Sequence, residues 1–358
     1  MTEEKKTMKM RNVIALVLAL AMTLSMAACA KEEAQPTAAP TEAPVVEAAP
    51  ETAEAAPETE APAAEPVNVM VLNGTTGFGM ANLMDAAANG EASQTYNFTV
   101  ETDASNIVAA LANGSADIAA LPTNAAATVY NKTQGGVQIL ALNTLGVLYL
   151  VTDGSVTIES MADLAGQTVY VPAQNPTFIF QHICQANGLT DVTIDNTYAQ
   201  PADLNTAVAA GEVSIAVLPE PMVTVARSKN ADLTVALDLT EEWDKVSPAG
   251  SLVQGCVVVR KAFAEENPAA VAAFLEEYGA SIEALTADIE GTAAKIEAQG
   301  IFTKAAVAAK AIPNCNVCFI TGAEMQSAMA EFLNIMFEVA PASVGGAIPG
   351  DDFYCILG

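Results

Sequence analysis

The chain carries one sequence motif twice. Residues 106–122 read NIVAALANGSADIAALP, and residues 203–219 read DLNTAVAAGEVSIAVLP. At a constant offset of 97 residues, seven of the 17 positions are identical, including Gly114/Gly211 and both Leu-Pro pairs. Each copy is predicted to be a helix that stops at the glycine, then a buried strand, then a loop that opens at the proline. The duplication therefore predicts two similar α/β lobes.

Short apolar runs rich in β-forming residues recur along the chain, and helix-like stretches separate most of them. The runs lie at residues 67–72, 96–100, 117–121, 137–142, 168–171, 192–195, 214–218 and 233–237. Short buried strands that alternate with helices are typical of parallel α/β sheets. In such sheets a ligand binds beyond the carboxyl ends of the strands. Two facing lobes would therefore bring both Leu-Pro loops to one cleft.

The last third of the sequence has mainly helical periodicity. Asn267-Pro268 is a favourable helix start, because Asn caps helices and Pro suits the first helical position. A second helix is predicted from the apolar stripe Met325, Met329, Phe332, Leu333 and Met336. We interpret these stripes as core surfaces.

The N-terminus has the features of an export signal. Basic residues up to Arg11 precede an apolar run, residues 13–28, which is shorter than the ~20 residues of a comfortable membrane span. The run ends Leu-Ser-Met-Ala-Ala before Cys29, and this ending resembles the lipobox of bacterial lipoproteins. The resemblance implies a signal peptide over residues 1–28 and a diacylated Cys29, held at the outer face of the cytoplasmic membrane. The alternative is an ordinary signal peptide with an incidental Cys.

Residues 30–66 are predicted to form a spacer behind the lipidated Cys29. They contain seven Pro and nine Glu but one Lys, in loose Ala-Pro-Glu-Thr repeats. Proline blocks helix continuation, the carboxylates repel one another, and few residues there are able to build a core. We expect segment 29–66 to be a disordered tether that holds the rest of the chain away from the membrane.

The remaining residues, 67–358, form an acidic body. They carry nine basic and 31 acidic residues, so their formal net charge is −22 within the −28 of the whole chain. Nucleic-acid binding is driven by Lys and Arg that displace phosphate counterions, so we expect no nucleic-acid partner. The same charge argues against attraction of the body to an anionic membrane, which leaves the membrane association to the lipid anchor.

Four stretches of the body carry a family resemblance. They are VNVMVLNGTTG at residues 67–77, GSADIAALPTN at 114–124, LAGQTVYVP at 164–172 and SVGGAIP at 343–349. With the lipobox, the tether and the duplicated lobes, the chain resembles a solute-binding lipoprotein of an ABC importer. It is most similar to the nitrate/sulfonate/taurine family, which includes binders of thiamine-precursor pyrimidines.

The resemblance implies a type II periplasmic-binding-protein fold, with two α/β lobes joined by two crossing segments and a ligand cleft between them. The crossings are expected near residues 149–153 and 252–258. Lobe one would combine residues 67–150 with 255–358, and lobe two would be residues 151–254. The implied function is to capture a small molecule and deliver it to an ABC permease and its ATPase, as a monomer and without a cofactor.

The candidate ligand-binding residues follow predicted strands. Their side chains are neutral hydroxyls and amides, apart from one glycine and one carboxylate. They are Gly74, Thr75, Thr76, Thr123, Asn124, Thr144, Gln174, Asn175, Thr177 and Glu220. The turn at Gly74 offers free N–H groups to a polar or anionic group. For each residue, a turn or helix-capping role is the alternative to ligand contact.

Glu220 bears on the type of ligand. None of the nine basic residues of the body lies in the candidate loops, whereas a sulfonate or nitrate favours Arg, Lys or helix N-termini without carboxylates. A carboxylate beside the cleft suits an amine or an aminopyrimidine. We therefore predict a neutral or amino-bearing solute ahead of an inorganic oxyanion.

Enzymatic and metal-binding functions have weak support in the sequence. His182 is the only histidine, and Cys184 two residues later would point to a different helix face. Cys315-Asn-Val-Cys318 has no second pair to complete a zinc site. Fungal pyrimidine synthases share the fold, but their Cys-rich motif is missing here. We therefore predict no catalytic and no metal-binding residues.

Two points stay open. Five cysteines, Cys184, Cys256, Cys315, Cys318 and Cys355, remain after lipidation, and Cys315 has both Cys318 and Cys355 as possible partners. The second point is the role, because a stalked sensory or adhesive lipoprotein is the alternative to an importer's binding protein.

Overall fold

The computed structural model describes residues 65–356. These residues belong to the second of two compact units, which spans residues 61–358. The predicted signal peptide, the lipidation site Cys29 and the tether up to residue 64 lie outside the described residues.

The first sheet has six strands in the order β11-β4-β10-β3-β1-β2. The strands are β1 (Val67–Leu72), β2 (Tyr96–Glu101), β3 (Ile118–Pro122), β4 (Val137–Thr144), β10 (Gly255–Arg260) and β11 (Val317–Ile320). β1 runs parallel to β2 and β3, whereas β10 runs antiparallel to β3 and β4. β3 and β4 are therefore parallel to each other, and the carboxyl ends of β1, β3 and β4 lie at one edge of the sheet.

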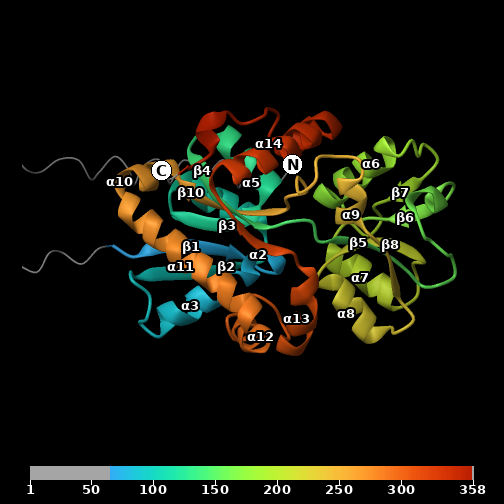
Figure 1. The fold of residues 1–358 in the computed structure, drawn as a ribbon, viewed down its shortest axis with the longest axis horizontal. Helices are drawn as coiled ribbons and strands as arrows, with labels where there is room; N and C mark the ends of the chain where they lie inside the picture. Colours follow the sequence, from blue (N-terminus) through green and yellow to red (C-terminus); the bar gives the residue numbers. More distant parts are fainter. Residues whose placement is uncertain (1–64, 357–358) are drawn as a thin grey trace, which may run out of the picture. The chain divides into compact units, whose positions relative to one another are not determined.

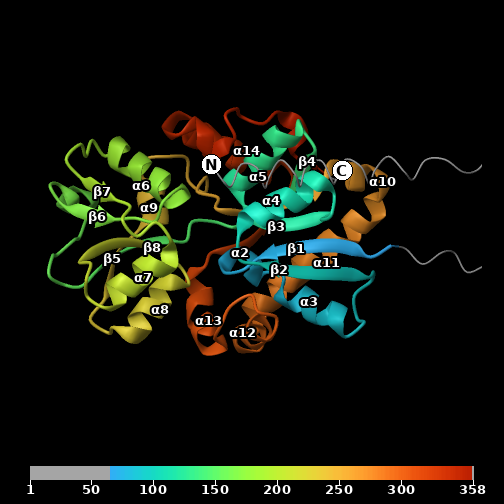
Figure 2. The ribbon, with the colours of Figure 1, turned by 180° about the vertical axis from the view of Figure 1, so that it is seen from behind.

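Helices cover both faces of the first sheet (Figures 1 and 2). On one face lie α4 (Ala104–Asn113), α5 (Thr123–Thr133) and α14 (Gly322–Val339), whose buried side chains share one hydrophobic cluster. On the other lie α3 (Ala81–Ala88), α11 (Pro268–Ala287), α12 (Ile289–Ala298) and α13 (Ala305–Ala311), with a second cluster. The short helices α2 (Thr75–Phe78) and α10 (Lys261–Glu266) follow β1 and β10. The predicted helix start at Pro268 and the buried stripe Met325–Met336 are confirmed.

The second sheet has five strands in the order β7-β6-β8-β5-β9. They are β5 (Leu148–Thr152), β6 (Thr168–Tyr170), β7 (Thr193–Asp195), β8 (Ile215–Pro219) and β9 (Thr234–Asp238). β6 is parallel to β7 and β8, whereas β5 is antiparallel to β8 and β9. Its helices are α6 (Asn175–Ala186), α7 (Pro201–Ala209), α8 (Met222–Lys229) and α9 (Leu239–Asp244). The two-sheet α/β architecture agrees with the predicted fold class.

The two sheets repeat one plan, as the duplicated motif predicts. β2-β1-β3 corresponds to β7-β6-β8, and each triplet is followed by an antiparallel strand, β10 in the first sheet and β5 in the second. In the motif itself, α4 leads through Gly114 to β3, and α7 leads through Gly211 to β8. Both glycines have positive φ, 82° and 76°, a left-handed conformation that costs L-residues with a Cβ.

The antiparallel strands show where the chain passes between the sheets. β4 ends at Thr144 and β5 begins at Leu148, so residues 145–147 form one connection. α9 ends at Asp244 and β10 begins at Gly255, so residues 245–254 form the other. The sequence-based crossings near 149–153 and 252–258 thus fall mainly on the strands β5 and β10. Lobe one and lobe two denote the halves built on the first and the second sheet; the predicted lobe boundaries themselves stay a prediction.

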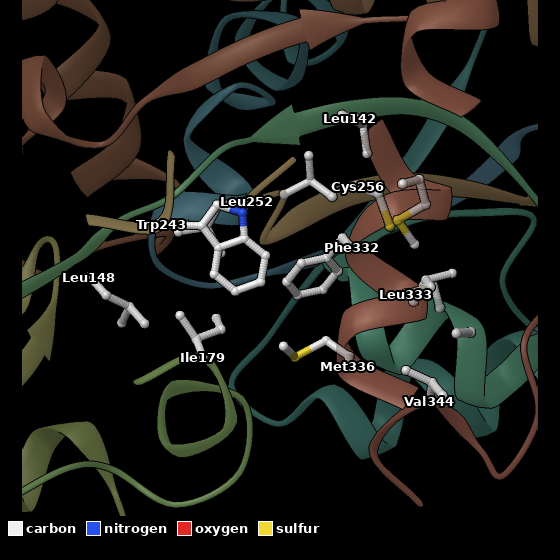
Figure 3. Packing of buried hydrophobic residues seen from close by; sticks show 14 of the residues in the cluster. Leu142, Leu148, Ile179, Trp243, Leu252, Cys256, Phe332, Leu333, Met336 and Val344 are labelled. Atoms are coloured by element: carbon white, nitrogen blue, oxygen red, sulfur yellow. The ribbon is translucent and has the colours of Figure 1, made fainter. Parts of the chain in front are cut away.

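One hydrophobic cluster continues from lobe one into lobe two. Figure 3 shows Trp243 of α9 and Ile179 of α6 facing Phe332 and Met336 of α14. The ring centroids of Trp243 and Phe332 are 6.0 Å apart, within the range of favourable aromatic pairs. Since each fully buried side chain of this kind contributes about 1.5–3 kcal/mol, this cluster is a substantial link between the lobes.

Candidate functional site

A hydrogen bond joins the two lobes at the carboxyl ends of their strands. The Thr75 hydroxyl, in the first turn of α2 after β1, donates to the Glu220 carbonyl after β8 at 2.8 Å. Both residues are buried, with 8% and 4% of their surface exposed. Gly74 caps α2 with φ 86°, which allows the sharp turn out of β1. Two residues predicted for the site, 145 positions apart in sequence, are thus in direct contact.

The Glu220 carboxyl group is hydrogen-bonded to the first turn of α8, the helix that follows it. Its oxygens accept hydrogen bonds from the Thr224 N–H at 3.1 Å and the Thr224 hydroxyl at 2.9 Å. Burial raises the pKa of Glu220, while hydrogen bonds from Thr224 and Asn314 and the charge of Arg227 act in the opposite direction. In this conformation the carboxylate caps α8 instead of presenting free oxygens to a solute.

Thr123 and Thr144 hold the second connection between the lobes. The Thr123 hydroxyl donates to the Val253 carbonyl at 2.8 Å. The Gln254 N–H donates to the Thr144 carbonyl at 2.9 Å, and the Thr144 hydroxyl donates to the Asn143 amide oxygen at 3.1 Å. Both threonines are fully buried. Their hydroxyls are thus used within the protein, and neither of them caps a helix.

Thr76 and Asn124 keep their side chains available. Both are half-buried, and their backbone carbonyls accept from Asn143 and Thr128. Within residues 65–356 neither side chain makes a hydrogen bond to protein. Because Thr76 follows β1 and Asn124 follows β3, both lie at the edge of the first sheet where its parallel strands end.

The lobe-two candidates follow β6. The Thr177 hydroxyl donates to the Pro172 carbonyl at 2.7 Å and accepts from the Asn196 amide at 2.8 Å, so it stabilises the turn. Gln174 is exposed and caps α6 with φ 70°. The side-chain oxygen Oδ1 of Asn175 is buried and has no hydrogen-bond partner. A buried acceptor without a donor costs free energy. Among the candidate residues, Asn175 is therefore the one that most needs a hydrogen-bond donor.

Several junction residues were missed by sequence reasoning. The Gln254 side chain accepts from the Val147 N–H at 2.8 Å, which ties the two connections together. The Tyr149 hydroxyl donates to the Asn314 carbonyl at 2.8 Å, and the Asn316 amide donates to the Gly146 carbonyl at 2.6 Å. Segment 314–316 lies directly before β11. Its only sequence signal is the Cys-Asn-Val-Cys spacing, which bears on metal binding instead.

Cys315 lies at the same junction. Its sulfur is 4.0 Å from the Thr75 hydroxyl, it is fully buried, and burial raises the pKa of its thiol. Burial also raises the pKa of Cys318 to about 12. All five cysteines of the described part are free thiols, so neither pairing considered for Cys315 is formed in this structure.

His182 lies in the hydrophobic link between the lobes. Its Nε2 is 2.8 Å from the Ser247 hydroxyl, and its ring centroid is 4.8 Å from that of Trp243. Burial lowers the pKa of His182, against the opposing charge of Glu338. Burial raises the pKa of Cys184 to about 12, which disfavours the thiolate that nucleophilic chemistry needs. Among residues 65–356 no group of three His, Cys, Asp or Glu side chains has a metal-binding arrangement.

Residues 66–312 match the family described as the substrate-binding domain of ABC-type glycine betaine transport systems. The chain belongs to this family. The match covers the strands β1–β10 and the Thr75–Glu220 junction. Together with solved structures of the same fold, it supports the predicted resemblance to solute-binding proteins of ABC importers. The search among curated proteins found no match.

Solved structures of binding proteins share the fold. A protein described as an ABC transporter from Parabacteroides distasonis is 25% identical, with a TM-score of 0.69 over 81% of this chain and 98% of that chain. The periplasmic aliphatic sulphonate-binding protein of Escherichia coli is 15% identical, with a TM-score of 0.65 over 79% and 96%. The alkanesulfonate-binding protein of Xanthomonas axonopodis bound to MOPS is 14% identical, with a TM-score of 0.58 over 80% and 96%. The last two show the fold alone.

The family is one of substrate-binding domains of ABC transport systems, and the solved structures that share this fold include a periplasmic binding protein. In the part of the chain from residue 65 to 356, no helix combines the length and the apolar character that a membrane span requires.

Proposed function

We propose that the chain is the extracytoplasmic solute-binding protein of an ABC importer. It captures a small molecule between its lobes and delivers that molecule to a permease. The contact between Thr75 and Glu220 supports this function most directly, because it brings together the strand ends at which α/β sheets bind ligands. Both residues lie within the part of the chain that matches the substrate-binding family.

Opening and closing of the cleft follow from the few polar contacts across it. The hydrogen bonds from Thr75 to Glu220 and from Tyr149 to Asn314 each contribute about 0.5–1.5 kcal/mol. Residues 145–147 and 245–254 are the connections about which the lobes turn. A solute that binds both lobes would favour the closed state by its differential affinity for the two states.

The solute is proposed to be neutral or amino-bearing. The side chains still available at the strand ends are the Thr76 hydroxyl and the amides of Asn124, Gln174 and Asn175. The Oδ1 atom of Asn175 has no hydrogen-bond partner in the protein and is able to accept one hydrogen bond or more. It therefore favours a solute that carries an N–H or O–H donor. This acceptor, and not the capped Glu220 carboxylate, now supports the predicted ligand type.

The anchoring is proposed as predicted from the sequence. Cys29 would carry the acyl chains, and segment 30–66 would join them to the folded body at the outer face of the membrane. The protein is proposed to act there as a monomer. Glu-rich, Pro-rich composition suits a spacer. A sensory or adhesive role rests on this tether alone, and no contact in residues 65–356 favours it.

Ligand-induced stabilisation tests the function and the solute class together. The full chain in neutral detergent would be melted with aminopyrimidines, amines, sulfonates and nitrate. We expect donor-bearing solutes to raise Tm, since a ligand at about 100 times its Kd stabilises by about 2.7 kcal/mol. The variant Asn175→Ala should lose this rise, whereas the exposed control Asn89→Ala should keep it. Stabilisation by sulfonates alone would overturn the proposed solute class, and no stabilisation with any imported solute would overturn the function.

A further inference from the structure

Part of the basic charge of the body lies on two helices that pack against each other. Of the nine basic residues of the body, Arg227 and Lys229 lie on α8, Lys310 lies on α13, and Lys304 directly precedes α13. These two helices pack against each other. Residues 221–231 and 300–316 contain no acidic side chain, in a body with 31 of them. Among the described residues, the ion pairs involve four other cations, Lys245, Arg260, Lys261 and Lys295.

A groove of about 330 Å³ lies between the two helices. Its lining is Thr224, Arg227, Ser228 and Ala231 from the α8 side, and Lys310 and Asn314 from the α13 side. These residues carry a guanidinium, an ammonium, two hydroxyls and an amide. The Glu220 carboxyl group beside them interacts electrostatically with Arg227 and accepts hydrogen bonds from Thr224 and Asn314. Within residues 65–356 Arg227 forms no ion pair, so its donors stay available to the groove.

The two cations reach the groove from different lobes. α8 packs into lobe two through Val223 and Ala226, which belong to a cluster with residues of β5 and β8. α13 packs into lobe one through Ala308 and Ala311, which belong to the cluster around β1 and α11. Closure of the lobes therefore brings two like charges to one groove, and like charges repel.

We propose that this groove binds an oxyanion, a phosphate or sulfonate group, which bridges Arg227 and Lys310 and thereby favours the closed state. The planar guanidinium offers paired donors to two oxygens of such a group, and the ammonium adds a point charge. The hydroxyls of Thr224 and Ser228 donate to the Glu220 carboxyl group and to the Val225 carbonyl, so the donors for the anion are those of Arg227 and Lys310. This anion site lies along α8, beyond the strand ends assigned to the solute. Its effect on closure rests on the lobe movement of the proposed function, whereas anion binding itself does not.

Anion titration of the full chain in neutral detergent tests the site. Inorganic phosphate, methanesulfonate and, at matched ionic strength, sodium chloride would be titrated into the wild type and into R227Q, K310Q and K132Q. Lys132 is an exposed control outside α8 and α13. We expect saturable binding of phosphate or methanesulfonate by the wild type and K132Q, and at least a tenfold loss of affinity in R227Q and K310Q. Equal binding by all four proteins, or no binding beyond chloride, overturns the proposal.

A lipid arm identifies the source of the anion. Dihexanoylphosphatidylglycerol, a soluble anionic lipid, would be compared with dihexanoylphosphatidylcholine. If only the phosphatidylglycerol binds, and its binding needs Arg227 and Lys310, then the site takes a lipid headgroup. If inorganic phosphate binds with the same dependence, then the site takes a free anion. The alkylation rate of Cys315 reports closure: it should fall with anion in the wild type and stay constant in R227Q. The rise of Tm with solute, measured in R227Q, tests the transport function separately, because Asn175 is intact in that variant.

Discussion

The hydroxyl of Thr75 forms a hydrogen bond between the two lobes. It is the group through which the end of β1 meets the end of β8, and it lies against the buried thiol of Cys315. A buried hydrogen bond of this kind contributes modestly when formed, but the Glu220 carbonyl would lose its partner if the hydroxyl were removed. Small changes at this residue should therefore act on the opening of the cleft more than on the fold of either lobe.

Replacing Thr75 by Val should make opening easier. The substitution keeps the shape and removes the hydroxyl, so the closed state should lose about 0.5–1.5 kcal/mol, and alkylation of Cys315 should speed up severalfold. Peptide mass mapping after timed alkylation measures this rate. Thr206→Val is the control, because the Thr206 hydroxyl bonds within α7 only. Unchanged protection of Cys315 in T75V would show that the hydroxyl does not restrain the lobes.

Glu220 should make stability depend on pH. Burial raises its pKa in the folded chain above the ordinary value of about 4.3 in the unfolded chain, so the folded state binds more protons between the two values. The contribution is therefore fully present below about pH 4.3 and is lost as pH rises through the raised pKa.

The comparison with Glu220→Gln isolates this effect. Gln keeps the side-chain size and does not titrate. The unfolding free energy of the wild type should therefore fall relative to that of E220Q as pH rises from about 4 to about 7. Urea unfolding at each pH gives the difference. A flat difference curve would mean that the hydrogen bonds from Thr224 cancel the cost of burial.

At the scale of elements, α14 joins the lobes by packing. It lies on the first sheet, yet Phe332 and Met336 face Trp243 of α9 and Ile179 of α6 (Figure 3). The Trp243 N–H donates to the Ser251 hydroxyl at 2.8 Å, so the indole is also fixed to the second connection. This side of the molecule is held by apolar contacts, while the strand-end side is held by single hydrogen bonds. Movement between lobes should therefore open at Thr75 and Glu220.

Phe332→Ala tests the contribution of this packing. Truncating a fully buried Phe costs about 3–5 kcal/mol, and the cavity here would lie beside Trp243. We expect a loss of that size in urea unfolding, together with a red shift of Trp243 emission as water reaches the indole. Asn334→Ala, exposed on the same helix, should change neither reading. A loss below about 1 kcal/mol would mean that α14 repacks without Phe332.

Local signals in the sequence predicted most of the elements, but not the partners of these elements. The helix, the glycine stop and the buried strand of both motif copies were predicted correctly, because a glycine stop and an apolar run act within a few residues. The loop expected to open at each proline was wrong: Pro122 and Pro219 are the last residues of β3 and β8, and α5 follows Pro122 directly. β5 and β10 were expected as crossing segments and not as strands, because their neighbours in the sheets come from distant segments. For the same reason the polar residues were identified by type while their bonds were not. Thr123 and Thr144 bond to the second connection, whose Gln254 carries no motif.

For the whole molecule, charge and anchoring are separate questions. The body has a net charge of −22, and general attraction to an anionic membrane is therefore unfavourable, even though α8 and α13 form a local basic surface. A basic surface of a few residues contributes about 1 kcal/mol per Lys or Arg close to anionic lipid, much less than two acyl chains at ~0.8 kcal/mol per buried CH₂. Stable membrane association should thus depend on Cys29.

Cys29→Ser should release the protein from the membrane. The wild type should enter the detergent-rich phase of a Triton X-114 separation, and C29S should stay in the aqueous phase or keep its signal peptide, which intact-mass measurement distinguishes. The exposed control K132Q should behave as wild type. If C29S, with its signal peptide removed, still enters the detergent phase, then the lipobox resemblance is wrong as an account of anchoring.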